Sequence, residues 1–183
     1  MAVNKVLIVY YSKTGFTKKY AEWIEESLSE GLSCDVFSYS KRRKIQLSQY
    51  DIILFGGGFH AGQINGIKWF KTQMHKLSDN ANRRIAVFAT GAMPAEAPDI
   101  EKALRQNFTE EEWAKITAFY LPGGLCYEKM GVGDRLMMAA FRALLKEKNV
   151  DSQMQQIVAH SFDLTSKELI TPLVEWCVSF RSK

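Results

Sequence analysis

The chain has 183 residues, of which 46% are hydrophobic and 24% charged, with a formal net charge of +4. Length and composition predict a single folded domain over residues 1–183 and exclude a disordered chain, a collagen-like chain and a disulfide-stapled miniprotein. The three cysteines are widely spaced and form no CxxC pair, which disfavours structural zinc and indicates a reducing, cytoplasmic location. The weak positive charge predicts no nucleic-acid partner, because such an interface concentrates basic residues on one face.

Apolar runs along the chain are short. The first, at residues 6–11, is too short for a signal peptide or a membrane span, and no later run reaches that length. The densest basic run is Lys41-Arg42-Arg43-Lys44. We interpret it as a solvated loop, with a docking patch as the alternative.

Strand-like and helix-like patterns alternate. Apolar β-branched runs predict strands at Lys5–Tyr11, Cys34–Tyr39, Asp51–Phe55, Arg84–Ala89 and Thr117–Leu121. Helical spacing predicts helices at Thr17–Leu32, Ile64–Leu77, Asp99–Asn107, Glu110–Ile116, Asp134–Lys148 and Thr165–Phe180. We expect capping boxes at Thr109 with Glu112 and at Thr165 with Glu168, and a restart of the last helix at Pro172 with Thr171 as its cap.

This alternation predicts an α/β fold with a doubly wound parallel sheet of five strands and an inserted helical segment, residues 122–162, after the fifth strand. Doubly wound sheets bind ligands beyond the carboxyl ends of their strands, where the winding reverses. We therefore expect the functional site in the loops after the first, third and fourth strands.

The loop after the first strand, residues 12–17, reads Ser-Lys-Thr-Gly-Phe-Thr and opens a helix. The free backbone N–H groups of a helix start attract anions, and hydroxyl side chains add donors to a phosphate. The loop matches neither the nucleoside-triphosphate nor the dinucleotide fingerprint. Ordinary turn and helix-capping roles for these residues are the alternative.

The loops after the third and fourth strands are rich in glycine and small residues. Gly56-Gly57-Gly58 is followed by Phe59 and His60, and Thr90-Gly91-Ala92 follows the fourth strand. Glycines allow a flat ligand to approach, and the two rings offer stacking faces and a donor. The alternative is a flexible turn with an aromatic side chain packed into the core.

Residues 12–17 match the pattern Ser/Thr-x-Thr-Gly-x-Thr, and through it the sequence resembles the flavodoxin family. The resemblance implies a flavodoxin-like sheet in the order 2-1-3-4-5 and FMN as the cofactor. It implies phosphate binding by Ser12, Thr14, Gly15 and Thr17, with backbone contacts from Lys13 and Phe16. It also implies that the other two loops hold the flavin ring, through the candidates Gly58, Phe59, His60, Ala61, Thr90, Gly91 and Ala92.

The stretch after the fifth strand resembles one flavodoxin branch, the menaquinone-dependent protoporphyrinogen dehydrogenases and their relatives. The shared features are a small-Leu-x-Tyr segment at residues 124–127 and an Asp-Arg start, at Asp134, to a Met-rich helix. The sequence departs from that branch in the phosphate loop and at residues 128–132, so a porphyrin substrate does not follow. Apolar residues at Met137, Phe141, Leu144 and Leu145 predict that helix 134–148 packs on the core. The alternative is contact with a partner or with the inner face of the membrane.

No nucleophile, paired carboxylate or metal spacing stands out, and His75 and His160 are interpreted as surface or capping residues. We predict no catalytic side chain and no metal ligand, so the cofactor supplies the chemistry. The first hypothesis is an FMN-dependent oxidoreductase or electron-transfer protein that serves a redox partner or a small acceptor such as a quinone. The basic charge favours an enzyme over a carrier. The alternatives are a non-catalytic module with a phosphate-binding loop and an NAD(P)H-dependent flavin or quinone reductase.

Overall fold

The computed structural model describes residues 5–39, 45–77, 83–148 and 152–179, except for the side chains of residues 153 and 154. The basic run predicted at residues 41–44 lies outside the described residues. Among the described residues, no helix is both long and apolar enough to cross a membrane.

Five parallel strands form the central sheet: β1 (Lys5–Tyr11), β2 (Ser33–Ser38), β3 (Ile52–His60), β5 (Arg84–Gly91) and β6 (Thr117–Pro122). Their order is β2-β1-β3-β5-β6, so the predicted order 2-1-3-4-5 is confirmed. A short strand that the sequence did not reveal, β4 (Gln63–Ile64), pairs antiparallel with the end of β3.

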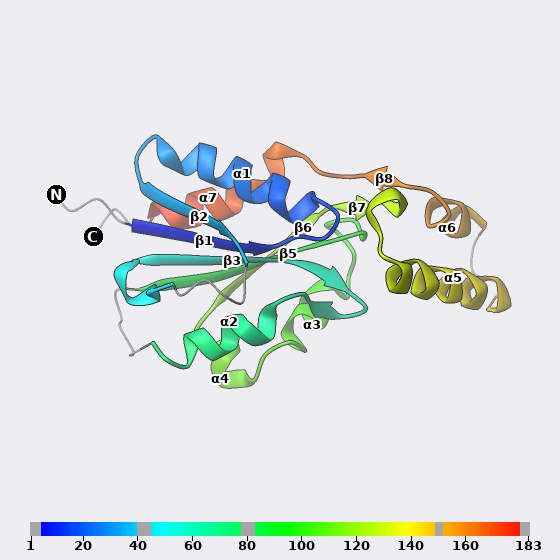
Figure 1. Cartoon of the computed structure of the whole chain (residues 1–183), viewed down its shortest axis with the longest axis horizontal. Helices are drawn as coiled ribbons and strands as arrows, with labels where there is room; N and C mark the ends of the chain where they lie inside the picture. The colour runs from blue at the N-terminus through cyan, green and yellow to red at the C-terminus, as the bar shows by residue number, and fades with distance from the viewer. Residues whose placement is uncertain (1–4, 40–44, 78–82, 149–151, 180–183) are drawn as a thin grey trace.

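Helices cover both faces of the sheet (Figure 1). On one face lie α1 (Phe16–Ser29) and α7 (Thr171–Val178), the latter preceded by the 3₁₀ helix η3 (Lys167–Ile170). On the other lie α2 (Ile67–Met74), α3 (Ile100–Arg105) and α4 (Glu110–Trp113), and the 3₁₀ helix η1 (Leu47–Gln49) precedes β3. The doubly wound arrangement expected from the alternating pattern is therefore present.

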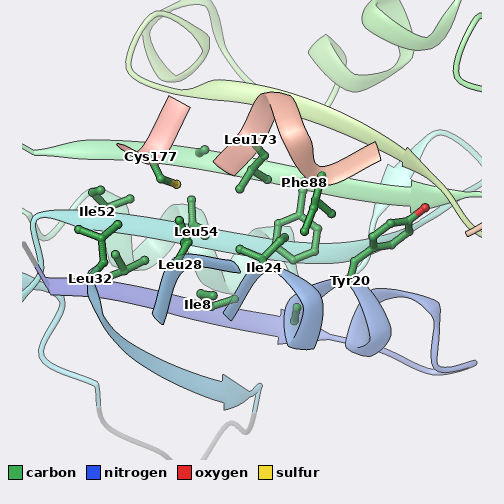
Figure 2. Packing of buried hydrophobic residues seen from close by; sticks show 14 of the residues in the cluster. Ile8, Tyr20, Ile24, Leu28, Leu32, Ile52, Leu54, Phe88, Leu173 and Cys177 are labelled. Atoms are coloured by element: carbon green, nitrogen blue, oxygen red, sulfur yellow. The ribbon is translucent and has the colours of Figure 1, made fainter. Parts of the chain in front are cut away.

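Successive residues of a strand point to opposite faces of the sheet and pack in two different hydrophobic clusters. Ile8 packs among residues of α1 and α7, whereas its neighbour Leu7 packs in the cluster that includes α2 and α3. Figure 2 shows the first cluster, where Phe88 of β5 meets Ile24 of α1 and Leu173 of α7. Because both faces are buried, the strands read as continuous apolar runs rather than as an alternation.

Strands β3 and β5 are longer than predicted. Gly56 and Gly57, expected in a loop, lie inside β3. Both positions need glycine because protein atoms fill the space that a Cβ would occupy. A Cβ on Gly56 would lie 2.1 Å from the Phe88 ring, and one on Gly57 would lie 2.6 Å from the backbone oxygen of Asn65. These two glycines serve packing rather than ligand approach. The two strands remain paired as far as Gly58 and Thr90.

Helix α2 begins three residues later than expected, because Ile64 pairs with Phe59 in the β3–β4 hairpin. The capping box of Thr109 with Glu112 is confirmed. The box expected at Thr165 is wrong, because that hydroxyl donates to Asp163 and the side chain of Ser166 caps η3 instead. A new helix does begin next to Pro172, as predicted. Thr171, however, is the first residue of this helix, α7, rather than its cap.

The region after β6 forms a small layer of its own beyond the carboxyl ends of the strands (Figure 1). It contains β7 (Gly124–Leu125), the 3₁₀ helix η2 (Tyr127–Lys129), α5 (Val132–Glu147), α6 (Ser152–Ile157) and β8 (Phe162–Asp163), with β7 and β8 paired. Its apolar centre consists of Met130, Met138, Leu145 and Val158.

Helix α5 does not pack on the sheet. Leu145 is buried as predicted, but Met137, Phe141 and Leu144 are 38%, 43% and 43% exposed. The expectation of a core-packed stripe is wrong for these three residues, because the buried residues of α5, Met138 and Leu145, pack in the small apolar centre of this region instead of in the two clusters of the sheet.

Candidate functional site

The predicted phosphate loop, residues 12–17, leads from β1 into the first residues of α1 and is held by a hydrogen bond within the loop. The Ser12 hydroxyl accepts a hydrogen bond from the Gly15 N–H at 3.1 Å, and Gly15 adopts the left-handed region with φ of 106°. Gly15 is also the N-cap of α1, which has no side-chain cap and no acid in its first turn. The 14-residue helix therefore presents uncapped N–H groups to this loop.

Thr17 and Thr90 meet at the centre of the site. Both side chains are buried, and their hydroxyl oxygens lie 2.6 Å apart. A Cβ on Gly58 would lie 3.9 Å from the Thr17 hydroxyl and 3.4 Å from the side-chain nitrogen of Asn65. Three of the predicted contacts, from the first, third and fourth strands, thus converge at one point. One hydroxyl proton of the pair remains free to donate to another acceptor.

The β3–β4 hairpin carries His60 and turns at Ala61-Gly62, both of which have positive φ. Asn107, beyond α3, fixes this turn. Its side-chain oxygen accepts from the Ile64 N–H at 2.9 Å, and its amide donates to the Gly62 carbonyl at 2.9 Å. Sequence patterns did not identify Asn107, because its partners, Gly62 and Ile64, lie far from it in the sequence.

The loop after β5 is held by Tyr120 of β6. The Tyr120 hydroxyl donates to the Met93 carbonyl and accepts from the Met93 N–H, both at 3.0 Å. Burial raises the pKa of Tyr120 to about 12, which keeps the phenol protonated and able to donate. A Cβ on Gly91 would lie 2.7 Å from that hydroxyl, so Gly91 permits this anchoring. The Cβ of Phe59 lies 3.4 Å from the same position.

Asp134, in the first turn of α5, reaches both loops. Its carboxylate lies 3.3 Å from the Lys13 ammonium and 3.8 Å from His60 Nε2. Among the described residues, no hydrogen-bond partner reaches His60 Nε2. The region after β6 is therefore part of the site, although the predicted set drew only on the loops after three strands.

The predicted candidates lie at one edge of the sheet, but in different environments. Lys13 and Ala61 are exposed, while Ser12, Thr14, Gly15, Phe16, Gly58, Phe59, His60 and Ala92 are half-buried, and Thr17, Thr90 and Gly91 are buried. Which of them contact a cofactor stays a prediction. Three further residues belong to this edge by position: Asn65, Tyr120 and Asp134.

The two remaining histidines lie outside this edge. His75 is 67% exposed and contacts the Glu112 carboxylate at 3.0 Å, and His160 is exposed. Both are surface residues, in agreement with the sequence interpretation. Within the described ranges, no three His, Cys, Asp or Glu side chains group as metal ligands do.

Comparison with solved structures gives neighbours of low sequence identity. A Streptococcus pneumoniae TIGR4 flavodoxin is 19% identical, with 63% of this chain and 79% of that chain covered and a TM-score of 0.48. A flavodoxin from Archaea is 20% identical (68% and 87% covered, TM-score 0.48). A flavoprotein in complex with FMN from Lactobacillus acidophilus NCFM is 23% identical (66% and 93% covered, TM-score 0.47).

No curated protein matches the chain. The family model described as "Flavodoxin domain" matches residues 7–153, which contain most of β1, the other four parallel strands and the predicted phosphate loop. The chain belongs to the flavodoxin domain family.

Proposed function

We propose that this protein binds FMN at the carboxyl ends of β1, β3 and β5 and acts as an FMN-dependent oxidoreductase or electron-transfer protein. The observation that carries the proposal is the uncapped start of α1 at the left-handed Gly15, in a chain of the flavodoxin domain family. When bound, FMN would supply the redox chemistry, because it takes up and releases electrons in one or two steps.

The charges around the predicted phosphate loop are compatible with a phosphate dianion. The first turn of α1 contains no acid, and the nearby carboxylate of Asp134 is paired with Lys13. The side chains of Ser12 and Thr14 are half-buried at the loop and can add hydroxyl donors to the backbone N–H groups. A Cβ on Gly15 would lie 3.4 Å from the Lys129 ammonium, the one near neighbour among the described residues apart from those adjacent in the chain.

The flavin ring would lie between the β3–β4 hairpin and the loop after β5. Both are held by hydrogen bonds within the protein itself, the first by Asn107 and the second by Tyr120. Preorganised loops lose little conformational freedom on binding, which favours tight retention of a planar group. At this end of the site His60 places a buried ring nitrogen that no hydrogen-bond partner among the described residues reaches.

For the electron acceptor we propose a small electrophile such as a quinone. Helix α5 begins at the site through Asp134 and exposes apolar side chains, with Val132 at 87% and Leu136 at 72%. An apolar surface next to the redox group would suit an apolar acceptor. Reduced, FMN-loaded protein should be reoxidised faster by a water-soluble quinone than by solvent oxygen alone. Equal rates with and without the quinone would count against this acceptor.

Peripheral contact of α5 with a membrane surface is a second proposal, supported by Arg135 and Lys146 beside the exposed apolar residues. The protein should sediment with phosphatidylglycerol vesicles and remain in solution with phosphatidylcholine vesicles. Leu136→Ser should weaken this sedimentation. Recovery of the protein in the supernatant with both vesicle types would contradict the contact.

The cofactor proposal is tested by visible absorbance and by titration of the apoprotein with FMN. A yellow protein, or saturable quenching of flavin fluorescence, supports FMN, whereas a protein that stays colourless in excess FMN favours the non-catalytic binding module. Thr14→Glu should abolish binding, because it places a carboxylate against the phosphate. Thr72→Glu, on the exposed surface of α2, is the matched control and should bind as the wild type does.

A further inference from the structure

The region after β6 brings a lysine to the phosphate loop. A Cβ built on Gly15 would lie 3.4 Å from the Lys129 ammonium, and apart from the two adjacent residues no other described residue comes within 4 Å of it. Lys129 ends η2, more than a hundred residues along the chain from the loop that it approaches. A cation therefore stands beside the left-handed glycine at the start of α1, where the backbone itself already favours an anion.

The backbone that carries Lys129 is held on both sides. The Tyr127 N–H donates to the Ser161 hydroxyl at 3.0 Å, and this hydroxyl donates to the Glu128 carboxylate at 2.8 Å. On the other side Met130 is 8% exposed and belongs to the small apolar centre of this region. The position of Lys129 is thus set by the fold of the region, and only its flexible stem has to adjust to a ligand.

The charge of Lys129 is uncommitted, unlike that of the other lysine at this loop. Lys13 is paired with Asp134 at 3.3 Å, which cancels its charge locally. Within the described part of the chain, no carboxylate forms an ion pair with Lys129. Of the two ammonium groups, Lys129 is therefore the one that can neutralise a phosphate.

Resting on the proposed binding of FMN, we propose that Lys129 binds the phosphate of FMN and makes the site select phosphorylated over unphosphorylated flavin. Hydroxyls and backbone N–H groups supply directional hydrogen bonds, and the ammonium adds a point charge opposite the dianion. A full charge at a partly exposed site should improve FMN affinity by about tenfold. Riboflavin, which has no phosphate, should gain nothing.

The experiment measures dissociation constants of FMN and riboflavin for the apoprotein by fluorescence quenching, at low and high salt. Lys129→Met should weaken FMN binding about tenfold, leave riboflavin binding unchanged and flatten the salt dependence for FMN. Lys129→Arg should restore most of the affinity. Lys148→Met, at the far end of α5, removes the same charge from an exposed position and should match the wild type.

Equal FMN affinity of Lys129→Met and wild type would overturn the role of Lys129 while leaving FMN binding intact. An equal loss for FMN and riboflavin would also overturn it, because Lys129 would then act through the shape of the region rather than on the phosphate. If riboflavin binds too weakly to measure, the salt dependence for FMN decides, and unchanged slopes in Lys129→Met contradict the proposal. A wild-type protein that binds no FMN would refute the proposed function itself.

Discussion

The hydroxyl oxygens of Thr17 and Thr90 lie 2.6 Å apart between α1 and β5, and both side chains are buried. Removing one hydroxyl leaves the other without its partner in a buried position. Thr17→Val should therefore lower the free energy of unfolding by about 1–3 kcal/mol. The double variant with Thr90→Val should lose less than the sum of the two single variants, because both polar groups leave together.

Urea unfolding of the four proteins in this cycle measures the coupling. Thr72→Val, on the exposed side of α2, serves as the control and should change the free energy of unfolding by no more than about 0.5 kcal/mol. Strict additivity of the two buried substitutions would show that the hydroxyls do not depend on each other.

Replacing the side-chain nitrogen of Asn107 by an oxygen, as in Asn107→Asp, should destabilise the protein. Its side-chain amide donates to the carbonyls of Gly62, Ala103 and Leu104, so a carboxylate in its place would face three acceptors. Asn107→Asp should lower the free energy of unfolding by about 3 kcal/mol and should also loosen the β3–β4 hairpin. Urea unfolding checks the first effect and amide hydrogen exchange at residues 60–64 the second. Gln106→Glu, at the exposed neighbouring position, should leave both nearly unchanged.

Glu112 makes the stability of the folded protein depend on pH. Burial pushes the pKa of Glu112 up, but hydrogen bonds from Lys71, from the Thr109 N–H and from His75 outweigh burial and hold it below its ordinary value of 4.5. The folded state then binds this proton less readily than the unfolded state does. The stabilisation is complete above pH 4.5 and is lost as the pH falls through the lowered folded pKa.

Glu112→Gln should therefore weaken folding by about 1–3 kcal/mol at neutral pH and flatten the fall of stability in acid. Urea unfolding at a series of pH values measures both effects. Glu111→Gln, which changes an exposed carboxylate next to it, should keep the wild-type pH profile. A Glu112→Gln protein whose stability falls as steeply as the wild type below pH 4.5 would contradict this assignment.

Ala61 occupies a backbone conformation that suits other residues better. Its φ is 46°, and with Gly62 it forms the two-residue turn of the β3–β4 hairpin. Asn tolerates the left-handed region and Asn-Gly is the preferred sequence of such turns, so Ala61→Asn should raise the free energy of unfolding by about 1 kcal/mol. Thermal unfolding followed by circular dichroism measures the gain. Ala61→Val, which is β-branched, should lower stability instead.

The sheet was predictable because its signal is local and repeated. Strands buried on both faces read as short apolar runs, as in Lys5–Tyr11, and alternation with helices indicates that the strands are parallel. Their order came from the resemblance to flavodoxins and not from the alternation. Their ends were harder to predict. Glycines usually mark turns, but Gly56 and Gly57 lie inside β3. They are glycines because atoms of Phe88, Ile64 and Asn65 fill the space that their Cβ atoms would need. No pattern within the strand itself carries that information.

The site was predictable only in its local part. Residues 12–17 form one contiguous motif, whereas Lys13 and Asp134 are 121 residues apart in the sequence. The exposed face of α5 was misread because its spacing is the same for a helix packed on a core and for a helix that leaves its apolar side open. Spacing defines a helix face, and only the three-dimensional arrangement shows what covers that face.

The region after β6 leaves the sheet and returns to it at a single residue. The Gly123 N–H donates to the Gly91 carbonyl at 2.6 Å, and the Gly123 carbonyl accepts from the Leu164 N–H at 2.7 Å. Two chain ends that meet this closely can be joined by a long connector, because the entropic cost of closing a loop grows only slowly with its length. The segment between these two residues can therefore be replaced by another segment, in evolution or by engineering, while the sheet stays the same.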